Sequence, residues 1–100
     1  MSNDAFEKLV NEYEKIVSLM PDDRDFDSHD FIQKLTQNNQ QLYIQALSEV
    51  GGAQPFQTVH GELAKRLKKR DDLVKQNGNR SSKNIFGLEN EVAVWRRVKK

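Results

Sequence analysis

The sequence predicts a mainly α-helical fold: a single helical domain over residues 1–100, built as a bundle of four to five helices. A chain of 100 residues holds one modest core, because a domain of this size buries only roughly 65% of its unfolded surface. Apolar side chains recur every three or four positions in two long stretches, residues 4–20 and Gln54–Arg70. Segments rich in Asp, Asn, Gln and Gly separate these stretches and favour loops.

The first expected helix covers residues 4–20, with Asn3 as its candidate N-cap and Pro21 just beyond its end. An acidic loop at residues 21–28 should follow, and Phe26 should turn back from it onto the core. The loop contains four aspartates, but it lacks the central glycine and the terminal glutamate of an EF-hand calcium loop. We therefore expect these carboxylates to be solvated or to cap a helix, and we predict no metal site.

Two helices are expected between residues 28 and 50. Asp27 or Ser28 should cap the first of them, because short polar side chains accept hydrogen bonds from the free N–H groups of a first helical turn. The apolar pattern then stops between Thr36 and Gln41, and Thr36 is the candidate N-cap of the second helix. A single bent helix over the same range is the alternative.

The next helix lies within Gln54–Arg70 and should end near Lys69 or Arg70. Pro55 suits its first position, where the missing N–H has no helical partner, and Gly51-Gly52 before it indicates a turn. Its lysines should lie on the side opposite the core. The core-facing positions, spaced by three and four residues, are Phe56, Val59, Leu63 and Leu67.

Residues 76–83 are rich in Gln, Asn, Gly and Ser, so we expect a flexible loop there. Residues 84–98 fit two structures. A helix beginning after Asn90 matches the helix dipole, with an acidic residue at its start and basic residues at its end. A short β-hairpin would pair residues 83–86 with residues 92–95, and the β-branched and aromatic content favours it. The helix is our first expectation and the hairpin is the alternative.

Each expected element contributes to the predicted core. Phe86 and Trp95 should anchor it in either C-terminal structure, because burying such a ring is worth about 2–3 kcal/mol. Leu73 and Val74 should return to it after the long helix. The predicted core consists of Leu9, Tyr13, Ile16, Phe31, Leu35, Leu47, Phe56, Leu63, Leu67, Phe86 and Trp95.

The composition of the chain excludes several classes of protein. The chain has no cysteine, so it has neither a disulfide framework nor a thiolate metal site. No apolar run approaches the ~20 residues of a membrane span, and the acidic N-terminus does not resemble a signal peptide. We therefore expect a cytoplasmic protein without a membrane partner.

Catalytic signals are sparse. His29 lies at an expected helix start and should be exposed, whereas His60 flanks the apolar stripe and should be partly buried and hydrogen-bonded. The glycines lack the pattern and the following lysine that cradle phosphates. We predict no catalytic residue, no cofactor and no small-molecule substrate, and hence no enzyme.

The net charge of +1 conceals an asymmetry between the two halves of the chain. Residues 1–50 carry four Lys/Arg against ten Asp/Glu (net −6), and residues 51–100 carry twelve against five (net +7). Such a split indicates either a partner for the basic half or an attraction between the halves.

A polyanion is the candidate partner of the basic half, because Lys and Arg contact phosphates with salt-sensitive affinity. The order of elements from Phe31 to Val98 resembles the layout of a winged helix-turn-helix protein: helices, a short glycine turn, a recognition helix and then a wing. This resemblance implies DNA binding by the helix that begins at Pro55. The candidate nucleic-acid-binding residues are Lys65, Arg66, Lys68, Lys69, Arg80, Lys83, Arg96 and Arg97.

We therefore expect a small non-enzymatic binding module, with nucleic acid as its first candidate partner. The alternative is a protein–protein interaction domain or homo-oligomer that uses the acidic first half or the region of Phe86 and Trp95. A run of lysines on a helix is also typical of a solvated face.

Overall fold

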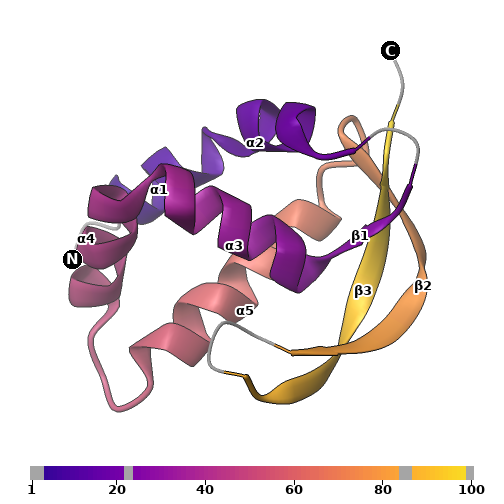
Figure 1. Ribbon diagram of the computed structural model, residues 1–100. Helices are drawn as coiled ribbons and strands as arrows, with labels where there is room; N and C mark the ends of the chain where they lie inside the picture. The colour runs from indigo at the N-terminus through magenta and orange to yellow at the C-terminus, as the bar shows by residue number, and fades with distance from the viewer. Residues whose placement is uncertain (1–3, 22–23, 84–86, 99–100) are drawn as a thin grey trace.

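Helices and a small sheet make up the fold, which the computed structural model describes for residues 4–21, 24–83 and 87–98. Within these residues there are five helices and a three-stranded antiparallel sheet, so the expected helical bundle is corrected to a mixed α/β fold (Figure 1). The sheet lies along one side of the helices (Figure 1). The helices are α1 (Asp4–Val10), α2 (Tyr13–Leu19), α3 (Ser28–Asn38), α4 (Gln40–Val50) and α5 (Pro55–Lys68), and the strands are β1 (Phe26–Asp27), β2 (Val74–Lys83) and β3 (Glu89–Arg97).

The stretch expected as one helix over residues 4–20 forms two helices, α1 and α2, with a turn at Asn11 and Glu12 between them. At this turn the backbone N–H of Glu12 donates to the carbonyl of Leu9 at 3.0 Å, one residue closer than in an α-helix. Buried side chains continue in phase across the turn, from Leu9 to Tyr13. The break leaves the apolar pattern intact, and neither Gly nor Pro marks it in the sequence.

Helix α3 begins where predicted because Asp27 caps it. The Asp27 carboxylate accepts a hydrogen bond from the N–H of Asp30 at 2.8 Å, and the Asp30 carboxylate accepts one from the N–H of Asp27 at 3.0 Å. The helix then runs through Thr36 to Asn38, so the prediction of two helices is confirmed. The prediction of Thr36 as an N-cap is wrong, because its hydroxyl donates to the Gln33 carbonyl at 3.2 Å inside the helix.

Helix α5 occupies Pro55–Lys68, as predicted, with proline in its first turn. The predicted core position of Phe56 is wrong, since this side chain is 41% exposed. Its ring lies 6.5 Å from that of Tyr43 on α4, so the first turn of α5 lies at the edge of the core. The other three predicted core positions of α5 are confirmed, because Val59, Leu63 and Leu67 are buried.

Residues 76–83, expected as a flexible loop, belong to strand β2, so that prediction is wrong. The strand pairs with β3 from Val74 to Lys83, and this pairing outweighs a composition that favours turns. An irregularity between Gln76 and Asn79 includes Gly78, whose φ of 89° suits glycine.

Strand β3 replaces the final helix that was our first expectation, so that expectation is wrong and a hairpin is present. The pairing also differs from the predicted one, because Val92 lies opposite Arg80 and not opposite a residue of 83–86. Residues 84–86 lie outside the described residues, and the predicted core anchor Phe86 is among them.

Strand β1 takes two residues from the expected acidic loop at 21–28, so this loop is shorter than predicted. Phe26 lies opposite Trp95 and Asp27 lies opposite Val94, which gives the sheet order β1-β3-β2. Phe26 is buried, as predicted. A segment near the start of the chain thus pairs with one near its other end.

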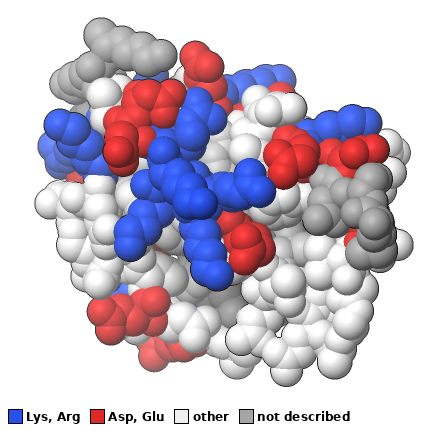
Figure 2. Space-filling model, turned by 180° about the vertical axis from the view of Figure 1, so that it is seen from behind, with Lys and Arg blue, Asp and Glu red and all other residues white. Residues whose placement is uncertain are grey.

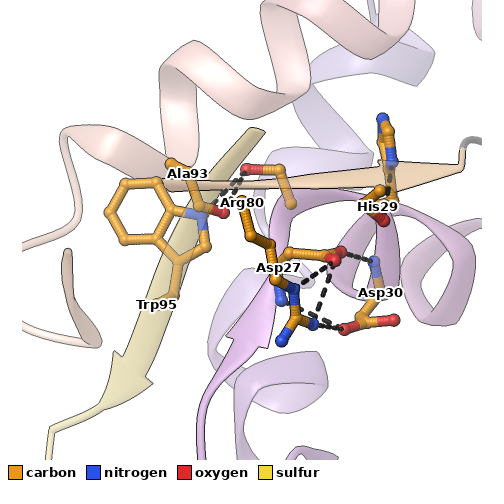
Figure 3. Close-up of polar contacts among 8 residues, drawn as sticks. Asp27, His29, Asp30, Arg80, Ala93 and Trp95 are labelled. Carbon is orange, nitrogen blue, oxygen red and sulfur yellow. Dashed lines mark hydrogen bonds and ion pairs between the residues drawn. The ribbon is translucent and has the colours of Figure 1, made fainter. Parts of the chain in front are cut away.

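Trp95 connects the sheet to the helices through a hydrogen bond. Its indole N–H donates to the hydroxyl of Ser28 at 2.9 Å, and this hydroxyl donates to the carbonyl of Ala93 at 3.5 Å (Figure 3). Ser28 lies in the first turn of α3, so β3 and α3 are joined at this point. Trp95 is buried, which confirms it as a core anchor.

Tyr13 lies fully buried at the centre of the core. Its ring meets that of Phe31 edge-on at 4.8 Å, and its hydroxyl donates to the carbonyl of Leu63 at 2.6 Å. Helices α2, α3 and α5 therefore meet at Tyr13. Leu47 is only half-buried, and Leu73 and Val74 are buried as predicted. The predicted core residues that the structure buries are Leu9, Tyr13, Ile16, Phe31, Leu35, Leu63, Leu67 and Trp95.

Candidate nucleic-acid interface

The outer face of α5 and the residue after it carry three exposed lysines, Lys65, Lys68 and Lys69. Figure 2 shows Lys and Arg side chains gathered in the middle of the face seen from behind, with acidic side chains around them. Lys65 lies 3.3 Å from Glu62, and such an exposed pair adds little stability. Lys68 and Lys69 form no ion pair with any described residue. We call these three lysines the lysine row.

Arg66 lies on the flank of the same helix and turns toward α1. Its guanidinium lies 3.2 Å from the carboxylate of Glu7 and 5.3 Å from the centre of the Phe6 ring. These contacts hold α5 against α1, so Arg66 borders the lysine row while it serves the fold.

Arg80 reaches from β2 to the start of α3 (Figure 3). Its guanidinium lies 3.0 Å from the buried carboxylate of Asp27 and 3.1 Å from that of Asp30. Both carboxylates belong to the capping box of α3. Arg80, a predicted phosphate contact, is therefore bound to the fold by two ion pairs.

The buried carboxyl of Asp27 stays ionised because its hydrogen bonds outweigh its burial. Burial alone would raise its pKa. Hydrogen bonds from the N–H of Asp30 and from the side chains of Ser82 and Arg80 lower it by a larger amount, so the net shift of the pKa is downward. The Asp27 carboxylate is thus a fixed negative charge that Arg80 offsets.

Arg96 and Arg97 lie at the far end of β3. Arg96 is 2.8 Å from the carboxylate of Asp25, and Arg97 donates to the carbonyl of Met20 at 3.3 Å. Hydrogen bonds from Arg96 and Asn77 hold the pKa of Asp25 below its ordinary value. The cross-strand neighbour of Arg96 is the exposed Lys75, which sequence reasoning did not select. Only the strand pairing reveals it, because Lys75 lies beside a segment expected to be a loop.

Among the described residues, four ion pairs join the acidic half of the chain to its basic half, which confirms an attraction between the halves. They link Arg66 with Glu7, Arg80 with Asp27 and Asp30, and Arg96 with Asp25. The arginines are thus engaged within the molecule, and the lysine row carries the remaining positive charge on α5.

The predicted site residues fall into separate groups. Those on and just after α5 share one helix, whereas Arg96 and Arg97 lie at one end of the sheet and Lys83 ends β2 opposite Glu89. The α5 group consists of Lys65, Arg66, Lys68 and Lys69.

A cleft of about 250 Å³ runs between α5 and β3, beside the lysine row. Lys65 and Lys68 line one side of it, and Val92, Ala93 and Glu91 line the other. Sequence reasoning did not identify Glu91 as a residue of this cleft.

The two histidines lie on different helices, and each contacts a hydroxyl group. His60 is half-buried and its Nε2 is 2.6 Å from the Tyr43 hydroxyl, which confirms the predicted hydrogen-bonded histidine. His29 is also half-buried, so its predicted exposure is wrong, and its Nδ1 lies 3.2 Å from the hydroxyl of Ser82.

Among the residues that the structure describes, no group of three His, Asp or Glu could hold a metal ion, and Asp22 and Asp23 lie outside them. No described helix is long and apolar enough to cross a membrane. No protein-family model, curated protein or solved structure matches the chain.

Proposed function

We propose that this protein is a non-enzymatic module that binds nucleic acid through a basic surface centred on α5. The observation that carries this proposal is the lysine row: Lys65, Lys68 and Lys69 are exposed along a helix whose opposite side is fixed in the core. Three ammonium groups on one side of a packed helix suit the evenly spaced phosphates of a nucleic acid. Phosphate contacts of this kind position a strand without reading its sequence.

The arrangement of elements supports the same proposal. A short strand, helices and a hairpin in the sheet order β1-β3-β2 resemble a winged helix-turn-helix protein, with α5 in place of the recognition helix and β2–β3 in place of the wing. The separate helix α4 between α3 and α5 departs from that layout, which has a short turn there.

Fluorescence anisotropy with a labelled DNA duplex and a labelled single strand, measured over a salt series, tests the proposal. Affinity for the duplex should fall with rising salt, with a log–log slope of about −0.9 for each phosphate contacted. The triple variant Lys65→Gln, Lys68→Gln, Lys69→Gln should weaken binding and reduce the slope by about one per lysine.

The control carries the same change of charge at exposed lysines of other helices, Lys8→Gln, Lys15→Gln and Lys34→Gln, and it should keep most of the slope. The proposal fails if nothing binds at low salt, or if the affinity does not respond to salt.

A protein–protein contact is the second candidate function, and its candidate contact residue is Ile44 on α4, an apolar side chain that is 65% exposed. Trp95 is buried and Phe86 lies outside the described residues, so neither supports an aromatic contact. If Ile44 joins two copies of the chain, sedimentation equilibrium should find a dimer that Ile44→Ser dissociates. A monomer at every concentration tested would exclude self-association through this residue.

A further inference from the structure

A cleft of about 620 Å³ lies between α3, the first half of α5 and β3, on the hairpin side of the molecule. Its volume falls within the range of about 300–1,000 Å³ that is typical of ligand sites. No Lys, Arg, Asp or Glu is present among its described lining residues, although these types make up 31% of the chain. The cleft therefore suits an uncharged group.

Gly61 forms part of the cleft wall and has no conformational reason to be glycine. It lies inside α5 with an ordinary helical φ, and a Cβ atom at this position would meet no described atom within 4 Å. Glycine in a helix interior costs about 1 kcal/mol relative to alanine. The missing side chain at Gly61 leaves the cleft wall open, so that a flat group can approach the α5 backbone closely.

Aromatic and amide side chains line the same cleft. The ring of Phe56 is 41% exposed and lies 6.5 Å from that of His60, nearly perpendicular to it. Burial, with a smaller effect of His29, lowers the pKa of His60 below its ordinary value, which favours the neutral imidazole. Gln54, Gln57 and Asn90 add amide groups that both donate and accept hydrogen bonds. A planar group with hydrogen-bonding edges matches this lining.

The cleft adjoins the smaller one beside the lysine row. Both are lined by Ala64 and Val92, and Lys65 and Lys68 line the smaller cleft. An uncharged cleft and a row of ammonium groups thus lie next to each other along α5. A nucleotide has the same two parts, an uncharged planar base and a charged phosphate.

We propose that the larger cleft holds one unstacked base of a single-stranded nucleic acid while the lysine row contacts the adjacent phosphates. This proposal rests on the proposed function and adds to it the form of nucleic acid that is bound. Stacking of a base on an aromatic ring tolerates any base, so the cleft favours single strands without selecting a sequence.

The test compares two labelled probes by fluorescence anisotropy: a strand of thymidylates, and an abasic strand with the same number of phosphates. The protein should bind the thymidylate strand more tightly, by roughly five- to a hundredfold, because stacking contributes only where a base is present. It should also bind the thymidylate strand more tightly than a duplex, whose bases are paired.

Two variants examine the cleft itself. Phe56→Ala removes the exposed ring and Gly61→Leu fills the wall, and both should bring the ratio between the two probes close to one. Affinity for the abasic strand and its salt dependence should remain. Gly61→Leu should also raise Tm, since leucine favours helix and its Cβ would meet no described atom within 4 Å. Leu19→Ala removes an exposed apolar side chain outside the cleft and should leave the ratio unchanged.

The outcomes separate the two proposals. Equal, salt-dependent affinity of the wild-type protein for both probes would overturn the base cleft and leave the proposed function standing. A ratio that Phe56→Ala and Gly61→Leu do not change would also overturn the cleft. Binding to neither probe nor to the duplex would overturn both proposals.

Discussion

Asp27→Ala is expected to destabilise the protein by about 2–4 kcal/mol. The substitution removes the N-cap of α3, worth about 1–2 kcal/mol, and the hydrogen bonds of the buried carboxylate with Arg80, worth about 1.5–3 kcal/mol with a charged partner. Arg80 is itself 47% exposed, so water compensates part of its loss. Urea unfolding followed by circular dichroism measures the change as a shift in midpoint at constant m-value.

Two further variants separate the cap from the charge. Asp27→Asn keeps a good N-cap and loses the ionised carboxylate, so it should cost less than Asp27→Ala. Asp71→Ala, at an exposed turn, should change stability by no more than about 0.5 kcal/mol. If Asp27→Ala were as stable as Asp71→Ala, the capping box and the Arg80 ion pair would contribute nothing to the fold.

The pH dependence follows from the lowered pKa of Asp27. A carboxyl with a lower pKa in the folded state contributes stability that is fully present above its unfolded value, about 3.9. This contribution is lost as pH falls through the folded pKa. Asp27→Ala should therefore lose less stability than the wild type between pH 5 and strongly acidic conditions, at about pH 1.

Tyr13→Ala is expected to cost about 3–5 kcal/mol, the range for deleting a large aromatic side chain from a core. The loss leaves a cavity between α2, α3 and α5 and removes the edge-on contact with Phe31. Tyr13→Phe keeps the ring and removes only the hydrogen bond to the Leu63 carbonyl, which is worth about 1 kcal/mol. Urea unfolding of both variants gives the two contributions separately.

Tyr43→Ala is the matched control, and its effect should be smaller because Tyr43 is only half-buried. Equal losses of stability at the two tyrosines would contradict the central place of Tyr13 in the core.

Burial raises the pKa of Tyr13, although the charges of Arg66 and Arg70 oppose this shift. The neutral Tyr13 hydroxyl therefore contributes its full stability below the pKa of an unfolded tyrosine, about 10, and this contribution is lost as pH rises. The stability of Tyr13→Phe should be less sensitive to alkali.

Local signals in the sequence predicted the elements that depend on neighbouring residues. Pro55 and the spacing of Val59, Leu63 and Leu67 located α5, and Asp27 located the start of α3. These signals act within one or two helical turns, so the sequence displays them directly.

The sheet depends on partners far along the chain, and here the sequence predicted less. The polar segment 76–83 forms a strand because β3 pairs with it, and the two-residue strand at Phe26–Asp27 exists only beside Trp95. A strand register cannot be read from composition alone.

In the candidate site, too, features set by neighbouring residues could be predicted, and features set by distant residues could not. The lysine row could be predicted because helical spacing places all three lysines on one side of α5. The engagement of Arg80 and Arg96 could not, because their acidic partners lie 50 or more residues away in the chain. The larger cleft also escaped prediction, since α3, α5 and β3 form it only when packed together.

The pairing of Phe26 with Trp95 has a consequence for how the chain folds during synthesis. The first half of the chain contains α3 and its cap, but Arg80 and the strand that covers Phe26 are translated much later. Until β2 and β3 leave the ribosome, the carboxylate of Asp27 lacks Arg80 and β1 lacks its paired strand. Such long-range contacts slow folding, and so the nascent chain reaches its native state only after nearly all of these residues have emerged.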